Sequence, residues 1–444
     1  MLPIQKKSEE GQALVLLVLG FVAFLGFAAL AIDGGMVYSD RRHAQNGADA
    51  SSLGGAGSAG NTMESLGVFY ANFDCSGFGN AATDIGQVHV AALAAASTRA
   101  TSNDYSIDYD ISDNHGVVAT CVDDEDKGSY IDKYIDVNTH ITRVTDTALI
   151  HFVYSGPVQE QVEAVARVRP RTPLAFGHAV VAFNDAPCQG NSLIGIKFSG
   201  SSDVDINGGG VYSNGCMVCS GGAFDVDVVD GNVNYADSTN CTGGDPVSPP
   251  PQQVSPLPSG SLTADPPDCT GLPNQGSHSG GGTINPGTYT QITISNGSLV
   301  MNPGLYCITG SPNAFRANGG DISGDGVTIY VQNGGVDVSG NVDPIDLRAP
   351  DANPDPSPAI SGMLFYVETG GNAVQLTGNN NSYYEGMIYA PNGDVTISGG
   401  NGTFPTFNTQ IVGYNVEITG NATVDINFNG AENYANPPKL DLQE

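Results

Sequence analysis

A short pattern of alternating apolar and polar residues that ends in glycine recurs at a fixed interval near the end of the chain. It reads Val-Gln-Leu-Thr-Gly at 374–378, Val-Thr-Ile-Ser-Gly at 395–399 and Val-Glu-Ile-Thr-Gly at 416–420, so the interval is 21 residues both times. Alternating apolar residues of a strand lie on one face. One strand cannot bury that face alone, so successive coils must share a core. The pattern predicts a parallel β-helix rather than a propeller, whose blades repeat at about 40–50 residues.

The predicted solenoid covers residues 176–440 and has two interruptions. Looser copies of the pattern occur at 204–208, 336–340 and 424–427, and Asn-Pro-Gly-x-Tyr occurs at both 285–289 and 302–306. A Pro-rich loop occupies 245–258, and an insertion occupies 349–358. Loops that leave one face of a solenoid often bind partners. A passive crossover is an equally good interpretation of both segments.

Composition agrees with short strands joined by tight turns. The 444 residues include 59 Gly and 26 Pro, and the formal net charge is −31. Such a surface repels nucleic acid, so we expect no nucleic-acid partner. The acidity by itself indicates solubility more than calcium binding. We therefore predict no metal site and no cofactor.

Eight cysteines all follow the apolar segment described below, which favours structural disulfides in an oxidising compartment. A CxxC pair with turn-like flanks lies among them, and no second pair completes a zinc site. The candidate disulfide residues are Cys75, Cys121, Cys188, Cys216, Cys219, Cys241, Cys269 and Cys307.

Residues 13–32 form an uncharged run of twenty residues, long enough to cross a bilayer as a helix. We predict a cytoplasmic tail at 1–12, a transmembrane helix at 13–32 and a helical extension at 33–60, with the bulk of the chain outside the cytoplasm. A cleaved signal peptide is the alternative, because Ala29-Leu30-Ala31 resembles a cleavage site.

Residues 61–175 read as a small α+β module. Apolar spacing predicts one helix that includes Met63, Leu66, Tyr70 and Phe73, and another over 85–96. Alternation predicts strands at 105–111, 135–141 and 162–168. The acidic run at 122–128 reads as a solvated loop. The fold class is therefore mainly β, with a transmembrane helix, an α+β module and a parallel β-helix.

The N-terminal segment also carries spaced features of a known family. Gly11-Gln12 precedes the span, Asp33 closes it, and Tyr38, Arg41-Arg42, Gln45-Asn46 and Ala48-Asp49 follow. This segment resembles the N-terminal module of TadG-like Flp pilus-assembly proteins. The resemblance implies a membrane-anchored component of pilus assembly or related surface machinery. A type IV prepilin would carry Glu five residues after its processing Gly, whereas Leu16 stands five residues after Gly11, so we expect no such processing.

We predict no catalytic residues. Enzymes built on a β-helix cluster Asp, Arg or His on adjacent coils. Here Arg316 and Arg348 stand apart, and the repeat region holds only His178 and His278. Two alternatives stay open. One is an adhesin or carbohydrate-binding solenoid that uses exposed residues such as Asn379, Asn380, Tyr383 and Tyr384. The other is a polysaccharide-degrading enzyme with carboxylates that meet across coils, for example Asp205 and Asp227. The expected partners are the membrane and either pilus-assembly proteins or surface glycans.

Overall fold

The computed structural model describes residues 10–150, 156–190, 192–201, 203–222, 224–241, 246–258, 261–310, 312–351, 356–378, 381–399, 406–421 and 423–443. The chain forms two compact units. Unit 1 comprises Met1–Asp124, Lys133–Pro170 and Pro438–Glu444. Unit 2 comprises Glu125–Asp132 and Arg171–Pro437. The predicted tail at 1–12 lies largely outside the described residues.

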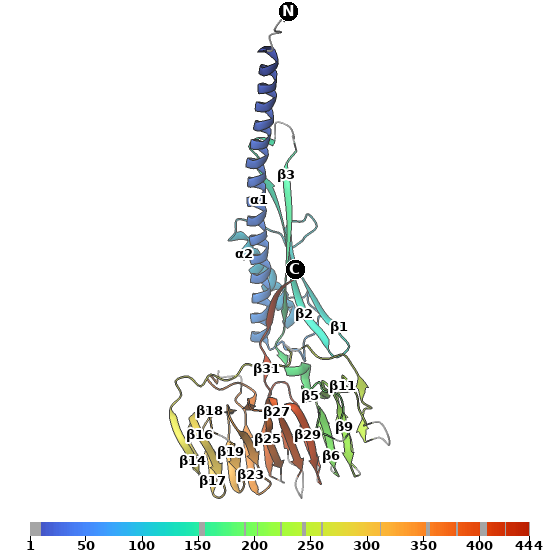
Figure 1. The fold of residues 1–444 in the computed structure, drawn as a ribbon, viewed down its shortest axis with the longest axis vertical. Helices are drawn as coiled ribbons and strands as arrows, with labels where there is room; N and C mark the ends of the chain where they lie inside the picture. Colours follow the sequence, from blue (N-terminus) through green and yellow to red (C-terminus); the bar gives the residue numbers. More distant parts are fainter. Residues whose placement is uncertain are drawn as a thin grey trace, which may run out of the picture. The chain divides into compact units, whose positions relative to one another are not determined.

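Unit 1 is built on one long helix, α1 (Glu10–Leu66), of 57 residues (Figure 1). The sequence between these limits contains no proline, so nothing interrupts the backbone hydrogen bonds. The span and the helical extension are therefore one element, which continues past residue 60. Tyr70 and Phe73 lie beyond its end, so their assignment to a helix with Met63 and Leu66 was wrong.

The second helix, α2 (Asp84–Thr101), is capped by the Thr83 hydroxyl, which accepts a hydrogen bond from the Gly86 N–H at 3.0 Å. Its buried face includes Ile85, Val88, Ala92 and Ala96, as the apolar spacing predicted.

A four-stranded sheet in the order β1-β2-β3-β32 completes unit 1. Its strands are β1 (Gly116–Asp126), β2 (Ile131–Thr145), β3 (Val158–Arg169) and β32 (Lys439–Gln443). β2 and β3 contain the predicted strands at 135–141 and 162–168 and pair antiparallel. β32 pairs antiparallel with β3, so the chain's last strand belongs to this sheet and the solenoid ends before 440.

Two local predictions in unit 1 were wrong. Residues 105–111 form no strand and make one bridge, between Asp108 and Gly116. Their alternation has another cause, because Tyr105 and Ile107 pack into the core from an irregular segment that follows α2. The acidic run at 122–128 lies mostly in β1, which continues to Asp126.

Small residues let α1 approach α2 and the sheet closely. A side chain on Gly55 would meet the Ala92 carbonyl oxygen and the Val137 side chain, both at 2.9 Å. The Ser51 hydroxyl donates to the Ala96 carbonyl at 2.9 Å, and the Ser52 hydroxyl donates to the Ala164 carbonyl at 2.8 Å. These small residues of α1 therefore pack within unit 1 itself.

Unit 2 is a parallel solenoid, as the repeat predicted, and its coils have three faces. Faces 1 and 2 are joined in one sheet because β16 (Gly287–Ile294), β27 (Met387–Gly399) and β29 (Ile411–Gly420) run through both. Face 1 also contains β5 (His178–Ala182), β8 (Gly210–Ser213), β11 (Val233–Tyr235), β13 (Gln252–Gln253), β18 (Gly304–Ile308), β21 (Val327–Val331) and β24 (Met363–Val367). Face 2 also contains β6 (Ile196–Gly200), β9 (Met217–Gly221), β19 (Asn313–Ala317), β22 (Gly335–Val338) and β25 (Gly371–Gly378).

Face 3 is a separate sheet of ten strands, each parallel to its neighbours. Its strands are β7 (Val204–Asn207), β10 (Val226–Val229), β12 (Val247–Ser248), β15 (Gly282–Ile284), β17 (Ser298–Met301), β20 (Gly320–Gly324), β23 (Val342–Arg348), β26 (Ser382–Glu385), β28 (Thr406–Asn408) and β30 (Val424–Asn427). β14 (Asn274–Ser279) pairs with β16, and β4 (Thr172–Pro173) pairs antiparallel with β31 (Ala435–Asn436). A short 3-10 turn, η2 (Leu174–Gly177), precedes β5.

The repeat explains the register between coils. Val374, Val395 and Val416 are direct partners across β25, β27 and β29, and so are the Gly residues that end each copy. The inward residues of these copies are fully buried in one continuous core. Stacking at equivalent positions thus buries what each coil alone would expose.

The coils are not stacked in chain order (Figure 1). From β5 the chain winds to β13 at one end of the sheet, continues at β14 at the other end, and winds back to β29. β29 then pairs with β5 and β6, and β30 pairs with β7. The first and last coils therefore meet at a seam inside the solenoid.

The Pro-rich stretch is part of this arrangement. Residues 246–253 contain β12 and β13, and the described residues 254–258 and 261–273 belong to the crossover between the two ends. Tyr212, Tyr366 and Tyr389 hold this crossover: the Tyr366 hydroxyl donates to the Ala264 carbonyl at 3.1 Å, and the Leu257 N–H donates to the Tyr212 hydroxyl at 2.9 Å. Position 245 and residues 352–355 of the insertion lie outside the described residues.

Candidate functional site

The eight cysteines form four disulfides in the structure. Cys75 pairs with Cys121 in unit 1. In unit 2 the pairs are Cys188–Cys216, Cys219–Cys241 and Cys269–Cys307. The two cysteines of the CxxC therefore bond to different partners and form no dithiol pair. Cys269 lies in the crossover segment and Cys307 on β18, so this bond ties the crossover to face 1.

Asp205 and Asp227 are direct partners on β7 and β10, and Asp425 of β30 lies on the other side of Asp205. Burial and the neighbouring Asp205 carboxylate raise the pKa of Asp425 above its usual range. The structure thus brings together the carboxylates that sequence reasoning paired. Within the described ranges, no group of three His, Cys, Asp or Glu side chains is arranged to hold a metal ion.

The residues considered for glycan binding are not all exposed. Tyr384 is fully buried and stacks on Phe407 with 5.0 Å between ring centroids. Tyr383 is half-buried, and its hydroxyl donates to Glu385 at 2.6 Å. Arg348 lies over the Tyr383 ring and pairs with Asp346 at 2.8 Å. Asn379 and Asn380 lie outside the described residues.

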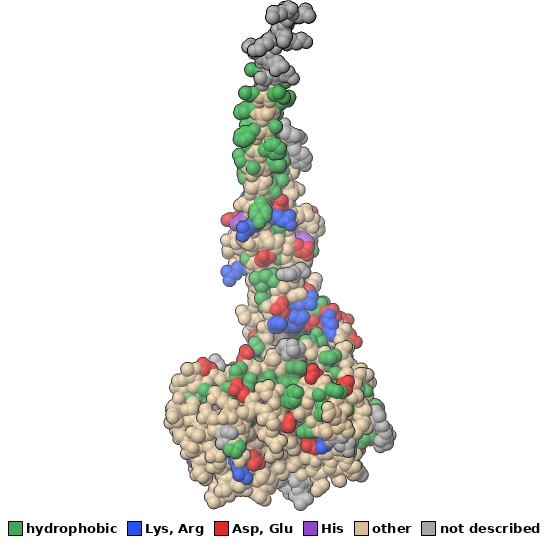
Figure 2. All heavy atoms as spheres, viewed as in Figure 1, with side chains coloured by type: hydrophobic (Ala, Val, Ile, Leu, Met, Phe, Trp, Pro, Cys, Tyr) green, Lys and Arg blue, Asp and Glu red, His purple; other side chains and the backbone are tan. Residues whose placement is uncertain are grey.

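The first half of α1 presents an uncovered apolar surface within unit 1. Its most apolar window has a mean hydropathy of 2.8, and none of that window is buried. Phe27, for example, is 73% exposed. Figure 2 shows hydrophobic side chains around this part of the helix. Among the described helices this one alone has the length and composition to cross a membrane, and it fits a single-pass anchor.

Asp33, the first residue after the apolar run, has its carboxylate enclosed by the β2–β3 hairpin. The residue is 3% exposed. Its carboxylate accepts hydrogen bonds from the backbone N–H groups of Ala148 at 2.8 Å, Leu149 at 3.0 Å and Ile150. These residues follow the end of β2 at Thr145. An ionised carboxylate with three N–H donors is well satisfied despite its burial.

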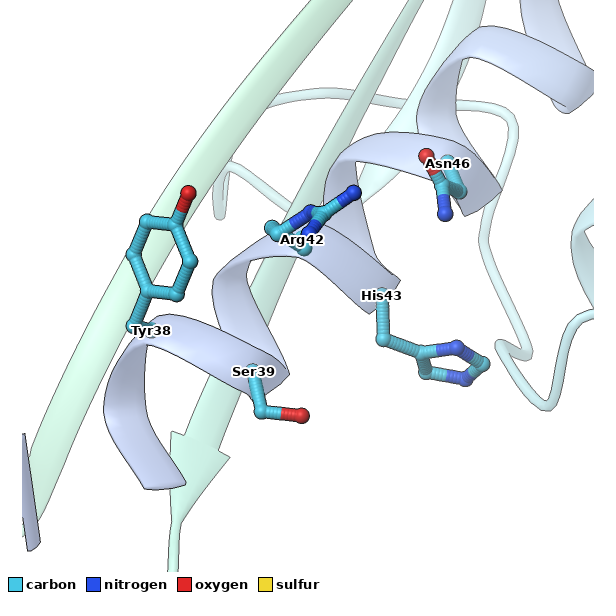
Figure 3. Close-up of a pocket in the computed structure, with 5 residues that line it drawn as sticks. All are labelled: Tyr38, Ser39, Arg42, His43 and Asn46. Carbon is cyan, nitrogen blue, oxygen red and sulfur yellow. The ribbon is translucent and has the colours of Figure 1, made fainter. Parts of the chain in front are cut away.

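A polar collar follows on the next turns of α1. It comprises Tyr38, Ser39, Arg42, His43 and Asn46, which line an open hollow of about 420 Å³ (Figure 3). All five residues come from one helix, so the hollow is a surface feature rather than an enclosed ligand pocket. Tyr and Arg are the residue types that anchor a span at the level of the lipid headgroups.

One family comparison bears on this region. Residues 11–58 match the family of putative Flp pilus-assembly TadE/G-like proteins. The match covers the apolar half of α1, Asp33, the polar collar and the first small residues that pack on α2. It supports involvement in Flp pilus assembly. No curated protein and no solved structure matches the chain.

Sequence reasoning missed the contact between Asp33 and the β2–β3 hairpin. The available signal was the apolar run Ala148-Leu149-Ile150, which lies between two predicted strands where a polar turn is expected. Its partner is 115 residues away along the chain, so no local pattern joins the two.

Proposed function

We propose that the chain is a non-catalytic, membrane-anchored structural component of Flp/Tad-type pilus assembly or of related cell-surface machinery. One observation carries this proposal: the family match at 11–58 coincides with the uncovered apolar half of α1 and the polar features that follow it. In this proposal the apolar half crosses the membrane, the rest of unit 1 stands beside the membrane, and the solenoid contacts other components.

The disulfides support an orientation with both units outside the cytoplasm. All four lie beyond the apolar segment, and disulfides persist in oxidising compartments. The N-terminus is then cytoplasmic. The two arginines after the span, Arg41 and Arg42, oppose the usual bias toward cytoplasmic cations, so the cysteines carry this argument.

The contacts of three basic residues of the solenoid support a structural role. Lys197 pairs with Glu417 at 2.8 Å across the seam, and Arg316 pairs with Asp337 at 3.4 Å across adjacent coils. Arg348 is held by Asp346 and Tyr383. These side chains link neighbouring coils or neighbouring residues. Catalytic groups, in contrast, converge on a common point.

Deletion of the gene and complementation in the native host test the proposal. We expect deletion to remove pili or pilus-dependent adhesion and the full chain to restore them. A chain whose residues 13–32 are replaced by a cleavable signal sequence should be secreted and should not restore them. The double variant Asp205→Asn/Asp227→Asn should restore them fully. Normal piliation in the deletion strain contradicts the pilus role, and failure of the double variant at normal abundance contradicts the non-catalytic role.

A further inference from the structure

We propose that the tip of the β2–β3 hairpin is a second membrane contact, inserted into the lipid interface beside α1 and held there by Asp33. The tip is defined here as Val144 together with Ala148, Leu149 and Ile150. The inference rests on the membrane anchoring in the proposed function. In this proposal the tip contacts the lipid bilayer itself, in the leaflet where α1 leaves the membrane.

The hydrogen bonds to Asp33 fix the height of the tip along α1. Asp33 directly follows the twenty apolar residues at 13–32, which span about 30 Å at 1.5 Å per residue. The backbone of Ala148, Leu149 and Ile150 donates to this carboxylate. When α1 crosses a bilayer, the tip therefore lies at the boundary between hydrocarbon and headgroups.

The exposed side chains of the tip suit that boundary. Val144 is 48% exposed, Ala148 is exposed, and Leu149 and Ile150 are half-exposed. Ile32 and Met36 of α1 also expose large apolar side chains, at 52% and 40%. Apolar side chains gain free energy when they enter the acyl boundary by about 5–10 Å.

Backbone N–H groups of the tip also have hydrogen-bond acceptors within the protein, as a segment in an environment with little water requires. An irregular segment at membrane depth needs partners for its N–H groups, because each unsatisfied group costs several kcal/mol. The Asp33 carboxylate supplies acceptors for three successive N–H groups. A carboxylate at the end of a span is in turn stabilised by those donors.

Polar groups border the tip on the side away from the apolar run. Arg143 lies 3.7 Å from Asp40, and Tyr38 and Arg42 belong to the polar collar on the following turns. This order along α1, from apolar to amphipathic to cationic, matches the order of layers in a bilayer leaflet. A docking site for a protein would not need the change from apolar to cationic side chains to coincide with the end of the membrane span.

The chain contains no tryptophan, so a single introduced Trp reports its own surroundings. The experiment uses the full chain in phosphatidylcholine and phosphatidylglycerol vesicles, with lipids brominated either near the carbonyl or near the terminal methyl. Leu149→Trp tests the tip, and Ala148→Trp replaces it if Leu149→Trp does not fold. Phe24→Trp reports the span. Tyr109→Trp is the water-facing control, because Tyr109 is 59% exposed and follows Tyr105, which contacts α1 at Gly47.

We expect Trp emission from the tip to be blue-shifted and quenched most by bromine near the carbonyl. Quenching of the tip emission should clearly exceed that of Tyr109→Trp, as interfacial insertion implies. Emission from Tyr109→Trp should be unquenched, since Gly47 lies fourteen residues, or about 21 Å, beyond Asp33. Quenching of Phe24→Trp without quenching at the tip overturns this inference and leaves the anchor intact. Absence of quenching at Phe24→Trp contradicts the anchor itself.

The role of Asp33 is tested by adding Asp33→Ala to Leu149→Trp. Loss of the carboxylate should free the tip, so quenching should fall toward the level of Tyr109→Trp. Asp40→Ala is the matched control, because it removes a carboxylate near the same helix surface that pairs with Arg143. Quenching that is unchanged by Asp33→Ala contradicts the proposal that Asp33 holds the tip at the lipid interface. An equal loss of quenching in Asp40→Ala contradicts it as well.

Discussion

Unit 1 and unit 2 bury their cores by different means. In unit 1 a single helix supplies glycine, alanine and serine so that α2 and the sheet approach its backbone, as at Gly55. In unit 2 each coil places valine, isoleucine or phenylalanine at the same inward positions, and neighbouring coils complete the burial. Unit 1 therefore depends on particular close contacts, whereas unit 2 depends on repetition. Four predictions test this contrast.

Ile397→Ala in unit 2 should have the largest effect. Ile397 is fully buried on β27, where it pairs with Leu376 and Ile418 of the adjacent coils. Removal of a buried aliphatic side chain costs about 2–5 kcal/mol. If coils depend on their neighbours, hydrogen exchange should rise mainly in β25, β27 and β29.

Thr396→Ala is the matched control for this prediction, because Thr396 occupies the next position on β27 and faces outward. Its effect should be within about 0.5 kcal/mol. Equal loss of protection in all coils, or in unit 1, contradicts the description of unit 2 as a stack of locally dependent coils.

The repeat allowed the solenoid and its inward residues to be predicted, because period and alternation are local properties. It also explains the register that the structure shows. The seam could not be predicted. Every coil has the same pattern, so nothing in Val416 or Ile196 indicates that they are partners across more than two hundred residues. The crossover that reverses the order reads only as a Pro-rich segment.

Unit 1 was harder to predict because its pattern is ambiguous. Tyr105 and Ile107 alternate like a strand, yet they are buried from an irregular segment. The span, Asp33 and α2 were recognisable from charge and spacing. The contact between Asp33 and Ala148–Ile150 depends on a hairpin whose end returns to the helix, and this is a tertiary property.

Asn415→Ala should destabilise the seam by about 2 kcal/mol. The Asn415 side chain accepts from the Asn184 side chain and the Gly195 N–H, both at 2.8 Å, and donates to Asp394 at 2.7 Å. It thereby joins the last coil to the first coil and to the preceding one. Loss of a buried hydrogen-bonding group costs about 1–3 kcal/mol.

Hydrogen exchange in β5, β6 and β29 measures this effect. Asn392→Ala, an exposed amide on β27 that donates to the Glu368 carbonyl at 3.0 Å, is the control and should change little. If Asn415→Ala instead raises exchange first at β14 or β13, the seam is not the weak point and the contrast with unit 1 needs revision.

Gly55→Ala and Gly57→Ala should change the stability of unit 1 in opposite directions. A Cβ on Gly55 meets a backbone carbonyl at 2.9 Å, so overpacking exceeds the gain in helix propensity, and we expect a net loss of about 1 kcal/mol. A Cβ on Gly57 meets only Leu440, at 4.0 Å, so the propensity gain of up to about 1 kcal/mol should remain. Exchange protection of α2 and β3 measures both. A gain in Gly55→Ala would show that unit 1 does not depend on close approach at this site.

The smallest expected effect at neutral pH concerns His178 in unit 2, because its contribution changes only in acid. Burial lowers the pKa of His178 to about 4, and its Nδ1 is enclosed without a hydrogen-bond partner in the part of the chain that the structure describes. Because the folded pKa lies below the unfolded value of about 6.5, the stability contribution is complete above pH 6.5 and is lost as pH falls toward 4.

With these two pKa values the loss at pH 5 should be at most about 2 kcal/mol, and it is absent at neutral pH. We expect exchange in β5 and β8 to rise between pH 6.5 and 5 after correction for intrinsic rates. His178→Gln should remove this dependence because the amide does not titrate, whereas His278→Gln on β14 should keep it. An unchanged acid response in His178→Gln would assign the response to carboxylates on the coils. It would then belong to the repeated surface of unit 2 rather than to a single enclosed side chain.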